Sequence, residues 1–347
     1  MRFPLIVAVV LIHTSLHKVT INGDLLVSEE QFPIYALLWH IVSDELACIA
    51  VPLFFFMSGF LFFYHTDFSL RAYGQKLKTR ARTLLVPYLF WNIMVLFLYF
   101  LTQQFLSSMT SGKNKLITDY GWMDWVNIFW SHSEGKPICY QFWFIRDLMV
   151  VILLSPILHV FIRRCKVFSV LILGVLWSFG LWMEVPGFSS TAFFFFSFGA
   201  WFSINRRNFT VDFLPMRWNA AFLYLALVVL STWVWRNNLM DTDYIHKTGI
   251  VVGLIAIVSW TARGVSTDRL PVSKFLAGSS FFVYAYHGMP LALLVKYWVK
   301  LLAPMNEWTM IAGYLCASVS IVGIGVGGYA LVRRYFPTLT ALVTGGR

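Results

Sequence analysis

Long apolar runs follow one another along the chain and are separated by short polar stretches. Continuous runs of about 20 apolar residues predict α-helices that cross a bilayer, whereas a transmembrane barrel shows alternating apolar and polar positions. Inside a bilayer only helices and closed barrels satisfy the backbone polar groups, so we expect each run to be helical. We predict an all-α polytopic membrane protein with about ten spans, at 3–17, 46–64, 84–106, 142–161, 167–183, 190–204, 218–235, 248–262, 280–302 and 309–332.

Charged residues sort onto alternate sides of these predicted spans. One side carries 18 of the 27 basic residues and three of the 16 acidic ones, and its first large loop is 65–83. Cytoplasmic loops carry an excess of Lys and Arg, so this side is predicted to face the cytoplasm together with both termini. The net charge of +11 is therefore mainly a topology signal, and we expect no nucleic-acid partner.

Composition excludes the main soluble classes. The 347 residues are 59% hydrophobic and only 12% charged, with a mean hydropathy of +0.69. A soluble domain carries about 25% charged residues. The four cysteines show no CxxC spacing and are predicted to be structural and unpaired. No linker or repeat divides the chain, which indicates one membrane domain over 1–347. Because Arg2 follows Met1 directly, a natural start upstream of Met1 stays open.

Ionisable side chains within apolar runs mark functional sites by default, and Arg2 and His13 form the leading pair. Eleven residues at 100° each bring both side chains to one helix face, about 16 Å apart along the axis. The pair would place a cation at the cytoplasmic mouth and an imidazole near mid-membrane. The alternative is a flanking arginine and a core histidine bonded to a backbone carbonyl.

The segment from Arg2 to His13 resembles the Arg-x10-His signature of the acyltransferase 3 family, which consists of integral membrane acyltransferases. Four further elements resemble motifs of the same family. Each motif alone is weak evidence, but five motifs in the same order along essentially the whole chain are specific for the family. The other four resembling elements are 51–60 (VPLFFFMSGF), 80–91 (RARTLLVPYLFW), 142–148 (FWFIRDL) and 282–290 (FVYAYHGMP).

The resemblance implies transfer of an acyl group, expected to be acetyl, from cytosolic acetyl-CoA to a hydroxyl of a saccharide or lipid-linked glycan. His13 would act as general base and Arg2 would hold a CoA phosphate. Arg80 and Arg82 either extend the CoA mouth or serve topology and contact anionic lipid. The expected partners are acyl-CoA, the glycan acceptor and membrane lipids in a bacterial inner membrane, with no tightly bound cofactor. The alternatives are a transporter of acyl groups or glycans and a membrane scaffold.

Two late residues are candidates for the same site. His287 lies in an apolar run with Tyr284 one turn before it. His287 would either complete the catalytic site or bond a backbone carbonyl.

No metal site is predicted, because the pair His13 and His17 has no clear third ligand. Direct transfer is favoured over an acyl-enzyme, because the chain has no GxSxG motif and no cysteine beside a histidine.

The remaining candidates lie on the predicted outer side, whose longest loops are expected at 18–45 and 107–141. Asp44, with Glu45, would orient a histidine or bind a sugar. Trp143 suits both an interfacial belt and stacking on carbohydrate. Arg146, beside Asp147, is a candidate for acceptor binding.

Glycine motifs in two apolar runs are interpreted as packing features. Ser58-Gly59 favours close helix packing over an oxyanion site. Gly323-x-Gly325-x-x-Gly328 matches a dinucleotide fingerprint, but that motif requires a preceding strand and a helix start. Here it lies inside an apolar run, so no nucleotide site is expected there.

Overall fold

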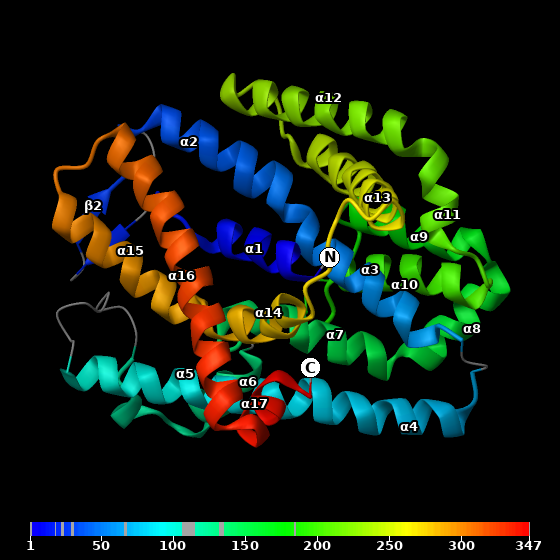
Figure 1. Ribbon diagram of the computed structural model, residues 1–347, viewed down its shortest axis with the longest axis horizontal. Coiled ribbons are helices and arrows are strands. Elements are labelled where there is room, and N and C mark those ends of the chain that lie inside the picture. Colours follow the sequence, from blue (N-terminus) through cyan, green and yellow to red (C-terminus); the bar gives the residue numbers. More distant parts are fainter. Residues whose placement is uncertain are drawn as a thin grey trace. The chain divides into compact units, whose positions relative to one another are not determined.

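The computed structural model describes residues 2–17, 19–21, 24–28, 31–65, 68–105, 115–131, 135–183 and 185–346. The described chain is mainly helical, which confirms the predicted all-α class in its coarse form. It divides into two compact units. Figure 1 labels the helices and strands that compose them. Unit 1 contains Glu45–Ala81 and Phe144–Lys274, and unit 2 contains Arg2–Asp44, Arg82–Trp143 and Phe275–Arg347. The prediction of one domain over 1–347 stays a prediction.

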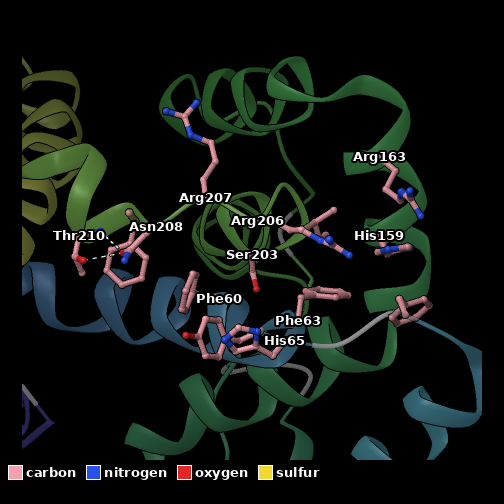
Figure 2. A pocket seen from close by; sticks show the side chains of 14 residues that line it. Phe60, Phe63, His65, His159, Arg163, Ser203, Arg206, Arg207, Asn208 and Thr210 are labelled. Carbon is pink, nitrogen blue, oxygen red and sulfur yellow. Dashed lines mark hydrogen bonds between the residues drawn. The ribbon is translucent and has the colours of Figure 1, made fainter.

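Unit 1 is built around two phenylalanine-rich helices, α3 (Ala50–Phe63) and α10 (Ser190–Ile204), which pack closely together. Helix α12 (Arg217–Arg236) packs on α13 (Asp243–Ser266), and α11 (Phe209–Phe213) also contacts α13. The other helices of this unit are α4 (Leu70–Arg80), α7 (Trp143–Leu153), α8 (Ser155–Cys165) and α9 (Val167–Ser178). A cavity of ≈ 900 Å³ lies among residues of α3, α8, α10 and α11 (Figure 2).

The contact between α3 and α10 is a main-chain contact at two points. A Cβ added to Gly59 would lie 1.9 Å from the carbonyl oxygen of Phe196. A Cβ added to Gly199 would lie 1.9 Å from the carbonyl oxygen of Phe56. Only glycine allows the two backbones to approach so closely. This contact confirms close packing at Gly59.

Unit 2 is organised around the long helix α16 (Glu307–Tyr335), which contacts α1 (Arg2–His13), α2 (Pro33–Trp39) and α15 (Gly288–Leu302). The Glu307 carboxylate accepts hydrogen bonds from the backbone N–H groups of Ile34 and Tyr35, at 3.0 and 2.8 Å, and so caps α2. The remaining elements are the hairpin β1 (Val19–Ile21) and β2 (Asp24–Val27), and the helices α5 (Val86–Phe105), α6 (Trp122–Trp130), α14 (Lys274–Tyr286) and α17 (Pro337–Thr344).

Helix α6 lies in the stretch 107–141, which was expected to be an outer loop. Its first turn is fixed by Asp124, whose carboxylate accepts from the Gly121 N–H at 2.8 Å and pairs with Lys115 Nζ at 2.7 Å. The Lys115 ammonium beside it and the Gly121 N–H hold the pKa of Asp124 below its usual range.

Five helical segments of the described chain are long and apolar enough to cross a membrane, and a bent pair gives a sixth. The pair is Tyr140–Leu153 and Ser155–Cys165, bent by 65°. Pro156 lies at this break, where it cannot continue the preceding helix. The short helices α1, α9 and α10 are apolar as well. The molecule is an integral membrane protein, whereas ten spans and cytoplasmic termini stay predictions.

Two predicted boundaries are wrong. The span expected at 46–64 belongs to a continuous helical segment, Pro33–Phe63, so part of the expected outer loop is helical. The basic loop expected at 65–83 is helical from Leu70 onward and continues into α5. Polar and charged side chains lowered the local hydropathy at both places although the backbone stays helical. All four cysteines are described, and none forms a disulfide, as predicted.

Candidate active site

His13 is the last residue of α1, and buried hydrogen bonds of unit 2 hold the chain around it. Thr14 donates to the Val10 carbonyl through its backbone N–H and its hydroxyl, at 2.9 and 2.8 Å. The Trp39 indole donates to the Thr14 carbonyl at 2.9 Å, and Ser318 donates to the Thr14 hydroxyl at 2.9 Å. These bonds tie the end of α1 to α2 and α16, so the His13 backbone has a fixed position.

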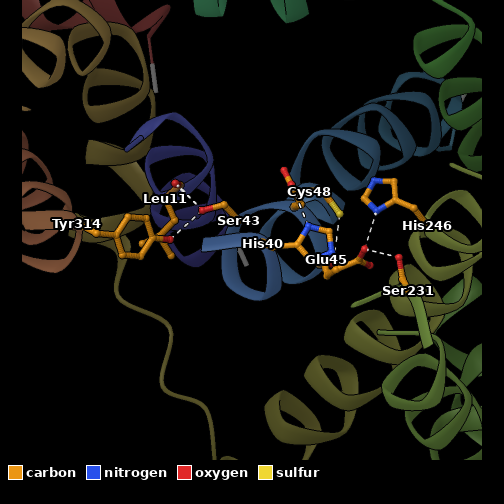
Figure 3. Close-up of polar contacts among 9 residues, drawn as sticks. Leu11, His40, Ser43, Glu45, Cys48, Ser231, His246 and Tyr314 are labelled. Atoms are coloured by element: carbon orange, nitrogen blue, oxygen red, sulfur yellow. Dashed lines mark hydrogen bonds and ion pairs between the residues drawn. The ribbon is translucent and has the colours of Figure 1, made fainter. Parts of the chain in front are cut away.

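A second set of bonds holds α1 one turn earlier. Ser43 donates its hydroxyl to the Leu11 carbonyl at 2.9 Å, and the Tyr314 hydroxyl lies 2.9 Å from the same Ser43 oxygen (Figure 3). Since the Ser43 proton is committed to Leu11, Tyr314 is the donor of the second bond.

His287 lies at the break between α14 and α15. Pro290 has no N–H to donate to the Tyr286 carbonyl, which interrupts the helical hydrogen bonds at this point. The His287 Nδ1–H donates to the Tyr284 carbonyl at 2.6 Å, which fixes the neutral tautomer and leaves Nε2 as an acceptor. The side chain is fully buried, and Nε2 has no hydrogen-bond partner among the residues that the structure describes.

The structure brings His13, His287 and Tyr140 together. The His13 and His287 ring centroids are 5.4 Å apart, and the Tyr140 ring meets the His13 ring edge-on at 5.1 Å. His287 is completely buried, whereas His13 keeps part of its surface accessible. His287 therefore bonds a backbone carbonyl, which was one of its two alternatives, and its ring also faces His13. A catalytic role for His287 stays a prediction.

The segment before α7 supports the buried imidazole. The Tyr284 hydroxyl donates to the Gln141 carbonyl at 2.6 Å, and the Gln141 amide donates to the Ala285 carbonyl at 3.0 Å. The Phe142 ring stacks on Tyr284, with 11° between the planes. Gly288 leaves room for Gln141, because a Cβ there would lie 2.5 Å from the amide oxygen. Tyr284 therefore positions His287 through its carbonyl and its hydroxyl.

The predicted basic residues lie elsewhere. Arg2 is exposed at the opposite end of α1 from His13, about 16 Å along the helix axis. In unit 1, Arg80 is half-buried at the end of α4, and in unit 2, Arg82 is exposed. Their roles toward CoA stay predictions.

The predicted outer-side candidates make contacts of their own. In unit 2, Asp44 Oδ2 lies 3.2 Å from His40 Nδ1, and Trp143 is half-buried where α7 begins. In unit 1, Arg146 donates to Asp147 at 2.9 and 3.0 Å, in an ion pair that is almost fully buried. Acceptor binding by these residues stays a prediction.

Glu45 is a buried carboxylate of unit 1. Ser231 donates to its Oε1 at 2.6 Å, and His246 Nδ1 lies 3.5 Å from the same oxygen (Figure 3). These partners come from α12 and α13, so the carboxylate fixes α3 to both helices through the segment that precedes α3.

Sequence reasoning missed Tyr140 and Gln141. Both precede Phe142 directly, at the edge of the FWF motif, within a stretch that was expected to be a loop. Their proximity to a motif that was already singled out was the available signal.

A partly accessible imidazole, His13, lies beside a fully buried one, His287, whose tautomer is fixed and whose Nε2 can accept a proton. Such a pair suits the removal of a proton from a hydroxyl. The Tyr140 ring shields one side of His13. This arrangement is chemically suited to base-assisted attack by an oxygen nucleophile, and the roles of the two histidines in such an attack stay predictions.

Comparison with known proteins agrees with this chemistry. The family described as an acyltransferase domain, Acyl_transf_3, matches residues 1–330. The succinoglycan biosynthesis protein ExoH of Rhizobium meliloti is 26% identical over 316 residues, which cover 88% of this chain and 81% of ExoH. No solved structure matches the chain. With 330 of its 347 residues matched, the chain belongs to the acyltransferase 3 family.

Proposed function

We propose that this protein is an O-acyltransferase of the bacterial inner membrane, which moves an acetyl group from cytosolic acetyl-CoA to a hydroxyl of a saccharide or lipid-linked glycan. The family supports the reaction class. The similarity to a protein of succinoglycan biosynthesis supports a glycan acceptor. The contact between the rings of His13 and His287 is the observation that carries the proposal.

Transfer proceeds in one displacement. His13, the more accessible imidazole, takes the proton of the acceptor hydroxyl while the oxygen attacks the thioester carbonyl. A C–O bond forms and the C–S bond breaks. The leaving thiolate recovers the proton from the His13 imidazolium, so the products are an O-acetyl ester and a free thiol.

His287 supports the same proton transfer through the His13 ring and does not contact the acceptor itself. Its Nδ1–H is held by the Tyr284 carbonyl, so Nε2 presents a lone pair in a buried environment. A hydrogen bond from the His13 ring to this nitrogen would orient His13 and favour its protonated form during attack. Arg2, at the exposed end of the same helix, would hold a CoA phosphate through its planar guanidinium.

The test uses the purified full chain in lipid nanodiscs with labelled acetyl-CoA and a series of glycans. Replacing His13 by Ala is expected to lower kcat by about 10²- to 10⁴-fold, the usual contribution of a general base. Ser15 is exposed and lies two residues from His13, so Ser15→Ala is expected to keep the wild-type rate. Thermal melting and size exclusion confirm that both variants are folded.

Two outcomes would contradict the proposal. Wild-type turnover in a folded His13→Ala variant would remove His13 as the base. Binding of acetyl-CoA by the wild type without transfer to any glycan, together with passage of label across the bilayer, would favour a transporter.

A further inference from the structure

The cavity of unit 1 gathers basic and aromatic side chains where α3, α8 and α10 end. Its volume is ≈ 900 Å³, and none of its fourteen lining residues is acidic. Three of them are arginines, namely Arg163, Arg206 and Arg207, which belong to the basic side of the sequence. We call this cavity the basic pocket.

The three arginines are engaged differently. Arg207 donates to Asp212 at 2.9 Å and stacks over Trp201 at 5.3 Å, so its charge is already compensated. Arg163 forms no hydrogen bond or ion pair within the part of the chain that the structure describes. Figure 2 shows Arg206 extending toward His159 and Arg163, whereas Arg207 extends away from them. Arg163 and Arg206 therefore extend on the same side of the pocket, beside His159.

A polar group inside the pocket lacks a partner. The Ser203 hydroxyl oxygen is buried and has no hydrogen-bond partner among the described residues. Buried hydroxyls are nearly always hydrogen-bonded, so such an atom indicates a site that a ligand or water completes. The position of the arginines has a simpler explanation, because cations at helix C-termini are favoured by the helix dipole. That explanation accounts for neither the cavity between the helices nor the buried Ser203 hydroxyl.

Backbone geometry at the rim is unusual as well. His65 and Arg206 both line the pocket and have φ of 48° and 55°, in the left-handed region that non-glycine residues rarely adopt. Such conformations persist where the surroundings enforce them, and they concentrate at binding sites.

Aromatic rings form an apolar wall beside the basic groups. The His159 ring stacks against the rings of both Phe63 and Phe68, at centroid distances of 5.7 and 4.4 Å, and the two phenylalanine rings also contact each other. His159 lies one helical turn before Arg163 on α8, so the wall and the cation are presented by one helix face.

We propose that the basic pocket binds the phosphate group of a larger ligand, with Arg163 and Arg206 supplying the charge and Ser203 donating a hydrogen bond. Arginine suits phosphate because its planar fork offers paired donors. The volume greatly exceeds that of inorganic phosphate, and the aromatic wall contacts the rest of the ligand. A phosphorylated coenzyme and an anionic phospholipid headgroup share this chemistry. The coenzyme source rests on the proposed acyl-CoA donor, whereas the lipid source is independent of acyl transfer in unit 2.

The first arm tests the coenzyme source. The full chain in phosphatidylcholine nanodiscs is titrated calorimetrically with adenosine 3′,5′-bisphosphate. Arg163→Gln and Arg206→Gln are expected to weaken binding about tenfold or more, because each removes a charged hydrogen-bond donor. Ser203→Ala, a small change, is expected to weaken binding severalfold. Arg164→Gln is the matched control, since Arg164 is exposed, adjacent to Arg163 and not part of the pocket lining.

The second arm tests the lipid source. Nanodiscs that contain phosphatidylglycerol are compared with nanodiscs of phosphatidylcholine alone, and thermal unfolding is measured. A headgroup in the pocket raises Tm for the wild type and Arg164→Gln, and this gain is lost in Arg163→Gln, Arg206→Gln and Ser203→Ala.

Pocket-dependent binding in either arm supports the proposal and identifies the source of the phosphate. Equal behaviour of the wild type, the three pocket variants and the control in both arms overturns it. An effect of Arg164→Gln as large as that of Arg163→Gln also overturns it, because it would show a diffuse surface charge. Ser203→Ala keeps the test decisive if an arginine variant fails to fold.

Discussion

At the residue scale, the candidate site rests on two histidines and on the groups that fix them. His13 and His287 were recognisable from sequence because an imidazole in an apolar run is costly unless it has a polar partner. Their contact was not recognisable, because it depends on how α1 and the joint between α14 and α15 meet in space. Gln141 was missed for the same reason, since its amide matters only beside Gly288 and Ala285.

Replacing His287 by Asn tests the roles of its two ring nitrogens separately. The Asn amide can still donate to the Tyr284 carbonyl but offers no acceptor in the place of Nε2. We expect kcat to fall about 10²-fold, at the lower end of the contribution of a proton-transfer group, with little change in KM for acetyl-CoA.

Tyr284→Phe provides the comparison, because it keeps the carbonyl that fixes the imidazole and loses only the hydroxyl bond to Gln141. A smaller loss of kcat is expected for it. A larger loss in Tyr284→Phe than in His287→Asn would show that the Tyr284 side chain, and not Nε2, matters for turnover.

At the element scale, apolar runs predicted where helices exist better than where they begin and end. The helical segment Pro33–Phe63 starts in a stretch that contains His40, Asp44 and Glu45, whose polarity hides it from a hydropathy pattern. Their partners compensate this polarity, and a sequence alone does not show those partners. The glycine fingerprint at 323–328 lies within α16, as its apolar setting predicted.

The glycine contacts between α3 and α10 are expected to be sensitive. Gly59→Ala or Gly199→Ala places a Cβ against a backbone carbonyl, which cannot rotate away. We expect a loss of about 1–3 kcal/mol in the free energy of unfolding, and a lower Tm in detergent.

Gly249→Ala is the control for this pair, because a Cβ at that helical position of unit 1 meets no atom within 4 Å. Alanine there is expected to be neutral or stabilising. Equal Tm values for Gly59→Ala, Gly249→Ala and the wild type would show that α3 and α10 do not pack as closely as described.

At the scale of the whole molecule, sequence correctly predicted the helical membrane class and the family, whereas the side that carries the positive charge stays a prediction. Charge segregation acts on every loop, so it survives errors in single boundaries. The predicted number of membrane spans does not survive such errors. Short helices such as α9 and α10 can cross the bilayer fully or partly, and so can the pair α7 and α8, which is bent by 65°.

Cysteine labelling tests the predicted orientation. In a variant whose four cysteines are replaced by Ser, Arg269→Cys lies on the basic side and Thr118→Cys on the other, both at exposed positions. A membrane-impermeant maleimide is expected to label Thr118→Cys in intact spheroplasts and Arg269→Cys only in inverted vesicles. The reverse pattern, or labelling of both sites in spheroplasts, would contradict cytoplasmic placement of the basic loops.

Helix α1 carries Arg2 and His13 at its two ends with apolar residues between them. The phase between the two side chains is therefore set by counting residues, and not by the identity of the residues in between. Exchange of one aliphatic residue for another leaves that phase intact, whereas deletion of a single residue would turn the guanidinium by about 100° around the axis. The apolar residues between Arg2 and His13 can therefore be exchanged for one another, but their number cannot change without misaligning the two side chains.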